Sequence, residues 1–384
     1  MAGTNIFGEL VRAQLENQAS DPSAVAKGSL YYDTTLNVPK YSNGSAYKYF
    51  LDITPLTSNS APDISADSIL TYDNSASIPK KAPIYQVLRH SGAQGRLTLT
   101  TALAVTTADV TGATTVYFTP YRGNLVELYD GTNWNVYEFS ELSQATTDNT
   151  KSPAAVANSK VYDIFVWNDS GTLRATRGPA WSSDTSRGTG AATSELEIFQ
   201  GRYVNKVDIT NGPVARRGLY VGTIRSDGSS QINDAKAFRH VWNYFNRVKR
   251  IMYKNDSTAT WNYTTATWRQ ANGSSSNQLD FVIGISEDFV EAMALVHTSN
   301  PTGNAEARIG IALDATNTND GTLTHPMNVV SSAAAQPKCF YKAYVAIGRH
   351  YLAWTEYSQA TGTMTWYGLS ANYIVSGIEG VLLA

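Results

Sequence analysis

Residues 114–142 read TTVYFTPYRGNLVELYDGTNWNVYEFSEL, and this stretch decides the class of fold. Apolar and polar side chains alternate before the turn Asp130-Gly131, and they alternate again from Trp134 to Phe139. Such alternation places apolar side chains on one face of a strand, and an Asp-Gly pair accepts the positive φ angles of a tight turn. The stretch therefore predicts an antiparallel hairpin with one buried face.

Similar stretches extend this pattern along the chain. Residues 160–178, KVYDIFVWNDSGTLRATRG, predict a second hairpin, with its turn at residues 168–171. Residues 216–231 predict a strand closed by Asp227-Gly228, and residues 334–368 predict a last strand pair around Thr361-Gly362. Short strands separated by turn residues are typical of sandwiches and barrels, so we expect a mainly β fold of β-sandwich or jelly-roll-like domains.

One stretch departs from the strand pattern. Residues 233–253 read NDAKAFRHVWNYFNRVKRIMY, and Asn233 or Asp234 can cap a helix at its start. Lys249 and Arg250 suit the C-terminal end of a helix dipole. The apolar side chains recur at helical spacing: Phe238, Val241, Trp242, Phe245, Val248 and Met252. We therefore expect one amphipathic helix over about residues 234–252.

The N-terminal region predicts a short helix followed by a hairpin. Apolar residues in 5–15 share one face of a helix that ends before Asp21-Pro22; a frayed arm is the alternative. Tyr31 and Tyr32 lie on the next predicted strand, and Asn43-Gly44 is a strong hairpin turn. The residues expected to anchor this segment to a partner are Ile6, Phe7, Leu10, Val11, Tyr31 and Tyr32.

Composition changes along the chain suggest four segments. Residues 1–55 are the helix-plus-hairpin segment, and the Ser-, Asp-, Ala- and Pro-rich residues 56–88 are a linker with short ordered pieces. We expect a β domain over 89–232 and the helix with a second β domain over 233–384. A single unit over 89–384 is the alternative.

Charge and cysteine content exclude several classes of protein. Charged residues make up 16% of the 384 residues, against roughly 25% in an average soluble protein, and the net charge is −2. We therefore expect no nucleic-acid partner, and no apolar run is long enough for membrane insertion. The single cysteine, Cys339, excludes an intrachain disulfide and a multi-thiolate metal site, and its apolar surroundings predict a buried thiol.

The sequence offers no catalytic constellation, cofactor motif or metal motif. No histidine pair has metal-ligand spacing, and neither the serine-hydrolase elbow nor the phosphate-binding glycine loop occurs. Glu287, Asp288 and Glu291 lie close in sequence, as in an exposed acidic turn, and this closeness gives no pair of facing carboxylates. We expect a protein without enzymatic activity, cofactor or metal.

Aromatic residues near turns are the best candidates for recognition. Exposed aromatic rings offer contact area at a low entropic cost and stack on sugar faces. Core packing is the alternative for each of them. The candidates for contact with a receptor or glycan are Trp134, Trp261, Trp268 and Trp366.

The N-terminal segment resembles that of many tailed-phage fibre and appendage proteins. These carry a Gly, a Tyr-Tyr-Asn/Asp-Thr run and an aromatic hairpin, matched here by Gly28, residues 31–34 and Asn43-Gly44. Tyr47 stands where the family usually has Trp. Later stretches, such as RHVWNYFNRVKR (239–250) and GRHYLAWTEYSQATGTMTWYG (348–368), are similar to phage virion proteins.

The resemblance implies a structural component of the virion, commonly a homotrimer, anchored to other virion proteins by its N-terminal segment. The chain would be made in the bacterial host cytoplasm, and its β-rich body would project outward and contact a host glycan or protein. Three functions follow, in order of preference: an appendage such as a tail fibre or head fibre, a capsid decoration protein, and a glycan-degrading tailspike.

Overall fold

The structure is a computed structural model of the chain. It describes residues 92–331, 333–370 and 374–384 and, before them, residues 16–18, 27, 29–35, 38–42, 45, 47–49, 68–73 and 78–83. The expected N-terminal helix, with Ile6, Phe7, Leu10 and Val11, lies outside the described residues. The chain divides into two units, Met1–Asp67 and Ser68–Ala384.

The N-terminal unit contains a small four-stranded sheet. Its order is β1 (Glu16–Gln18), β2 (Leu30–Asp33), β3 (Val38–Ser42) and β4 (Tyr47–Tyr49). β1 is parallel to β2, and the other neighbours are antiparallel, so the expected β3–β4 hairpin is present. The buried side chains of Asp33 and Lys40 form an ion pair of 2.9 Å across β2 and β3. Tyr31 and Tyr32 lie on β2.

A separate hairpin lies within the segment expected to be a linker. β5 (Ser68–Asp73) pairs with β6 (Ile78–Pro83) in antiparallel register.

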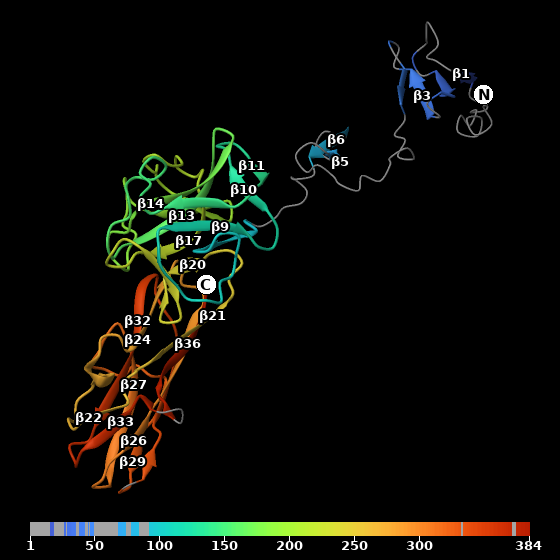
Figure 1. Cartoon of the computed structure of the whole chain (residues 1–384). Coiled ribbons are helices and arrows are strands. Elements are labelled where there is room, and N and C mark those ends of the chain that lie inside the picture. The colour runs from blue at the N-terminus through green and yellow to red at the C-terminus, as the bar shows by residue number, and fades with distance from the viewer. Residues whose placement is uncertain are drawn as a thin grey trace. The chain divides into compact units, whose positions relative to one another are not determined.

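The first part of the large unit is built from hairpins, as residues 114–142 predicted. β10 pairs with β11 around Asp130-Gly131, and β13 pairs with β14, so both predicted hairpins are confirmed. These strands lie in the green part of Figure 1. The strands here are β7 (Gly95–Thr98), β8 (Val110–Ala113), β9 (Thr115–Pro120), β10 (Leu125–Tyr129), β11 (Trp134–Glu138), β12 (Leu142–Ala145), β13 (Val161–Asp169), β14 (Thr172–Ala180), β15 (Leu196–Phe199), β16 (Arg202–Asn205), β17 (Leu219–Arg225) and β20 (Val241–Asn243).

The later strands include two sheets that pack as a β-sandwich, orange to red in Figure 1. One layer contains β24, β32 and β27, and the other has the order β21-β36-β25-β31-β28. The strands are β18 (Ile232–Ala235), β19 (Phe238–Arg239), β21 (Lys249–Asn255), β22 (Thr260–Tyr263), β23 (Arg269–Gln270), β24 (Gln278–Ile283), β25 (Phe289–Leu295), β26 (His297–Ser299), β27 (Ala305–Leu313), β28 (Leu323–His325), β29 (Met327–Val329), β30 (Ala334–Ala335), β31 (Lys338–Tyr344), β32 (Gly348–Ser358), β33 (Met364–Tyr367), β34 (Leu369–Ser370), β35 (Ile374–Val375) and β36 (Gly377–Leu383).

The sandwich core comes from alternate residues of both layers. Phe281 of β24, Ile311 of β27 and Trp354 of β32 are fully buried and belong to one apolar cluster with Val290 of β25 and Ile378 of β36. Burying a large side chain of this kind stabilises a fold by roughly 1.5–3 kcal/mol. The mainly β prediction is therefore confirmed, and the described residues contain one short 3₁₀ turn, η1 (Ala271–Gly273), as their only helical element.

The predicted amphipathic helix over 234–252 is wrong. This segment contains β18, β19 and β20, and it enters β21 at Lys249. Within β21, Arg250 and Met252 are buried while Lys249 and Ile251 are exposed, which is the period-two pattern of a strand. The helical spacing was a coincidence: Val241, Trp242 and Met252 are buried from two separate strands, whereas Phe238 is exposed on β19 and Phe245 and Val248 lie between β20 and β21. Valine, phenylalanine and tryptophan also favour strands.

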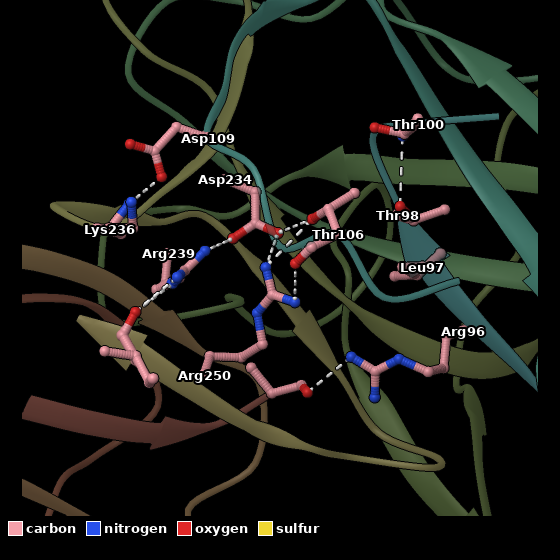
Figure 2. A network of polar contacts seen from close by, with 12 residues as sticks. Arg96, Leu97, Thr98, Thr100, Thr106, Asp109, Asp234, Lys236, Arg239 and Arg250 are labelled. Atoms are coloured by element: carbon pink, nitrogen blue, oxygen red, sulfur yellow. Dashed lines mark hydrogen bonds and ion pairs between the residues drawn. The ribbon is translucent and has the colours of Figure 1, made fainter. Parts of the chain in front are cut away.

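A buried polar network replaces the expected helix caps (Figure 2). Asp234, one of the two candidate N-caps, accepts hydrogen bonds from Arg239 Nη1 at 2.8 Å and from Arg250 Nη2 at 2.7 Å. Arg250 also donates to the carbonyl of Thr106 at 2.8 Å. Nearby, Arg96 of β7 donates to the carbonyl of Ala384 at 2.9 Å. The network thus joins the first part of the unit to the strands that lead into the sandwich.

Candidate binding groove beside the β10–β11 hairpin

A groove of about 300 Å³ lies where three turns of the large unit meet. Tyr129 and Tyr137 reach it from β10 and β11, and Trp167 and Asn168 reach it from the end of β13. Arg217 comes from the loop before β17. The lining of the groove therefore includes aromatic residues, an amide and a guanidinium.

The aromatic walls are held in place by strand pairing and hydrogen bonds. Trp167 donates its indole N–H to Thr176 Oγ1 at 2.6 Å across the β13–β14 pair, which fixes the ring while leaving it half-buried. Tyr129 donates its hydroxyl to the carbonyl of Gly131 at 2.8 Å. Rings fixed in this way lose little conformational entropy when a ligand stacks on them.

The polar groups sit on a preformed turn. Asp130 accepts hydrogen bonds from the backbone N–H groups of Asn133 and Thr132, both at 2.7 Å, and these bonds lower the pKa of its carboxyl group. Gly131 has a φ of +104°, and a β-carbon there would lie 2.5 Å from Arg217 Nη2. The φ angle therefore favours glycine, and the guanidinium lies against the turn near the Asp130 carboxylate.

Two donors in the groove have no partner within the described residues. The exposed Arg217 guanidinium makes no hydrogen bond or ion pair there, and the Asn168 side chain uses only its oxygen, which accepts from the Gly171 N–H at 2.6 Å. Open donors beside apolar rings are the usual composition of a site for a polar small molecule.

Trp134, one of the predicted contact residues, lies next to the groove and not in its lining. Its ring is 5.6 Å from Tyr129, and Arg202 lies over it at 4.6 Å. Its indole N–H donates to Gln200 Oε1 at 3.0 Å. These contacts use Trp134 to dock the β10–β11 hairpin on the β15–β16 hairpin, and so it supports Tyr129 from behind.

The other predicted contact residues lie in the sandwich, and two of them are not available to a receptor. Trp366 is fully buried and donates to Ser358 Oγ at 3.1 Å, and Trp261 is buried and donates to Glu356 Oε2 at 2.7 Å. Both are core residues because their rings point inward from β22 and β33. Trp268 is half-buried against Tyr357, with ring centroids 5.5 Å apart.

The acidic residues singled out in the sequence are paired with cations. Arg247 bonds Glu287 at 2.7 Å and Asp288 at 2.5 Å, and Lys342 bonds Glu291 at 2.6 Å. Within the described part of the chain, no group of three or more His, Cys, Asp or Glu residues is placed to hold a metal ion. Cys339 is buried, and burial raises the pKa of its thiol.

No helix among the described residues combines the length and hydropathy needed to cross a membrane.

Sequence reasoning missed Tyr137, Trp167 and Arg217. All three stand in stretches that the sequence predicts as strands, and nothing local shows that these stretches come together; in the structure Arg217 lies in the loop before β17. The available signal was the pair of hairpin turns, residues 130–131 and 168–171, each flanked by aromatic residues.

Comparisons with known proteins give distant likenesses. No protein-family model and no curated protein matches the sequence. The insecticidal delta-endotoxin Cry8Ea1 of Bacillus thuringiensis aligns at 6% identity over 83% of this chain and 58% of that chain, with a TM-score of 0.21. Infectious bursal disease virus strain Gx aligns at 11% identity over 75% of this chain and 78% of that chain, with a TM-score of 0.17.

The chain spans 58% and 51% of the length of two toxin structures that it matches, Cry8Ea1 and Cry7Ca1. TM-scores of this size support no argument about function.

Proposed function

We propose that this chain is a non-enzymatic structural subunit of a tailed-phage particle. Its N-terminal segment attaches it to other virion proteins, and its β body projects outward as part of a fibre or other appendage. The resemblance of the N-terminal segment motivates this assignment and the expected homotrimer. The division of the chain into a small N-terminal unit and a large β unit is in keeping with it.

The groove beside the β10–β11 hairpin is the observation that carries the host-contact role. A pyranose ring presents an apolar face to aromatic walls and hydroxyl groups to polar donors. Here Tyr137 and Trp167 supply the aromatic walls, and Asn168 and Arg217 supply the polar donors. A single groove of this size binds weakly, but several copies on one oligomer raise the effective concentration of the second binding event.

Binding of host surface polysaccharide to the immobilised full-length chain tests this role. We expect Arg217→Ala and Tyr137→Ala each to weaken binding about tenfold, since each removes interactions worth about 1.4 kcal/mol. Tyr117→Ala is the matched control, because Tyr117 is a half-buried tyrosine of β9 that does not line the groove, and it should bind like the unmodified chain. Equal binding by the unmodified chain, the two groove variants and the control would show that the groove is not the glycan-binding site.

Two measurements separate the alternatives. A glycan-degrading tailspike would release new reducing ends from the same polysaccharide, and the proposal expects none. A capsid decoration protein would be present in many copies per head, so quantitative mass spectrometry of particles distinguishes it from a scarce appendage.

A further inference from the structure

The outer face of the five-stranded sheet β21-β36-β25-β31-β28 has an unusual composition. Its opposite face packs into the sandwich core, whereas its outer face carries large apolar side chains in the open. Leu323 is 67% exposed, Ile251 63% and Phe340 42%. A groove of about 650 Å³ runs over these residues. Large exposed apolar patches mark interaction sites on soluble proteins.

Strand register arranges this face in rows. One row crosses the sheet as Tyr253, Glu379, Met293, Phe340 and Leu323, because each of these residues is opposite the next on neighbouring strands. The adjacent row is Ile251, Val381, Glu291 and Lys342. The first row is therefore mostly apolar, and the second row is apolar on β21 and β36. Each row contains one carboxylate, Glu379 on β36 in the first and Glu291 on β25 in the second.

Charges of both signs surround the apolar rows. Glu379 lies on β36, Lys249 on β21 and Lys338 on β31, and all three are exposed. Within the described residues, none of these three has an ion-pair partner, whereas Glu291 and Lys342 pair with each other at 2.6 Å. The carboxylates stand on central strands, and the unpaired lysines stand to either side of them.

This charge pattern identifies the occupant. A second copy of the same face, turned about a twofold axis, brings lysines toward carboxylates and apolar rows toward apolar rows. A membrane surface would not match the two glutamates, since anionic lipids repel them. We infer that this face is a self-association surface, and that its partner is the same face of a second copy of this chain.

The dimensions set the expected strength. The face has four such rows, the two above and those through Lys249 and Lys338. Five strands about 4.8 Å apart and four rows about 6.8 Å apart cover on the order of 400 Å². A standard stable interface buries about 800 Å² per partner. We therefore expect association that depends on concentration, with a dissociation constant in the micromolar range. The inference concerns assembly alone, so its failure would leave the glycan-binding test unaffected.

Sedimentation velocity of the full-length chain between about 5 and 200 µM tests the inference. The unmodified chain should shift toward a larger species as concentration rises. Leu323→Asp with Phe340→Asp should raise the dissociation constant at least tenfold, and unchanged thermal unfolding shows that the variant folds. Ile198→Asp is the matched control, because Ile198 is 64% exposed on β15, outside this face, and it should associate normally.

Charge reversal and cross-linking test direct contact between two copies of the chain. A substitution that only perturbs the fold would not produce the results expected here. Glu379→Lys should weaken association, and Lys338→Glu in the same chain should restore it. In a mixture of ¹⁴N- and ¹⁵N-labelled chains, zero-length carboxyl–amine cross-linking should join Glu379 of one copy to Lys249 or Lys338 of another. An oligomeric state that does not change with concentration, or an oligomer unaffected by the Leu323 and Phe340 changes, would overturn the inference.

Discussion

The carboxylate of Asp234 lies 2.7 Å from Nη2 of Arg250, and both side chains are buried where the first part of the large unit meets the sandwich. Arg239 bonds the other carboxylate oxygen at 2.8 Å (Figure 2). One carboxylate is therefore the counter-charge that two buried guanidinium groups share. Burial lowers the pKa of Arg250, and Asp234 opposes this effect.

Replacing Asp234 should destabilise the protein strongly. Asp234→Asn keeps the size of the side chain but leaves two buried arginines without their carboxylate, and breaking a buried pair in this way costs about 3–5 kcal/mol. Asp109→Asn is the control, because Asp109 is exposed and accepts one backbone hydrogen bond from Lys236. Chemical denaturation should show a large loss in the free energy of unfolding for Asp234→Asn, and a loss of under about 1 kcal/mol for Asp109→Asn. Similar losses in both would contradict this role.

A glycine-specific contact makes a second prediction. Gly222 lies on β17 opposite an irregularity in the β13 pairing, and a β-carbon there would come within 2.2 Å of the Trp242 carbonyl oxygen. Gly222→Ala should therefore force the backbone apart and lower the free energy of unfolding by about 1–3 kcal/mol. Gly228→Ala is the control, because nothing lies within 4 Å of a β-carbon at that position. If Gly222→Ala is as stable as the control, the close approach is not real.

Stability should depend on Asp280 at acidic pH. Burial raises the pKa of Asp280, but hydrogen bonds and charges from His240 and Arg349 outweigh burial and lower it to about 2. A carboxyl with a depressed pKa stabilises the fold above its unfolded pKa, and this contribution disappears as pH falls through about 4 toward 2.

We expect this group to contribute roughly 2 kcal/mol at pH 5. From pH 5 to pH 2, the free energy of unfolding should decline less in Asp280→Asn than in the unmodified chain. At pH 5 the variant should be the less stable of the two. Parallel declines would show that Asp280 is not the titrating group.

The N-terminal segment should be required for incorporation into particles. Strands β1–β4 all lie before Phe50, so removal of residues 1–51 deletes the whole four-stranded sheet. We expect the truncated chain to keep the near-ultraviolet circular dichroism of the β body and to be absent from particles formed in its presence. Normal incorporation of the truncated chain would assign the anchor elsewhere.

Local signals explain which parts of the fold were predictable. The hairpin at residues 125–138 was predictable because turn chemistry and alternation agree within 14 residues. The segment containing Asp234 and Arg250 was not, because its apolar residues suit a helix and one hydrogen-bond acceptor of Arg250 lies far away in sequence. Thr106, which accepts a hydrogen bond from Arg250, is separated from it by 144 residues.

The candidate groove was only partly predictable, for a related reason. A position near a turn says where a residue lies along the chain but not where its side chain points. Trp366 and Trp261 lie near turns and point into the core, whereas Tyr137 and Trp167 look like ordinary strand residues and line the groove. Whether such a side chain points into the core or lines the groove depends on how distant hairpins pack together, and the whole fold determines that packing.

Immunoelectron microscopy of intact particles, with an antibody raised against the β10–β11 hairpin region, tests the central claim most directly. The account predicts label on the outside of particles, at a few discrete positions, and competition between the antibody and host polysaccharide. Purified particles that lack the chain, or that expose it only after disruption, would contradict the proposal that it is an outward-facing virion subunit.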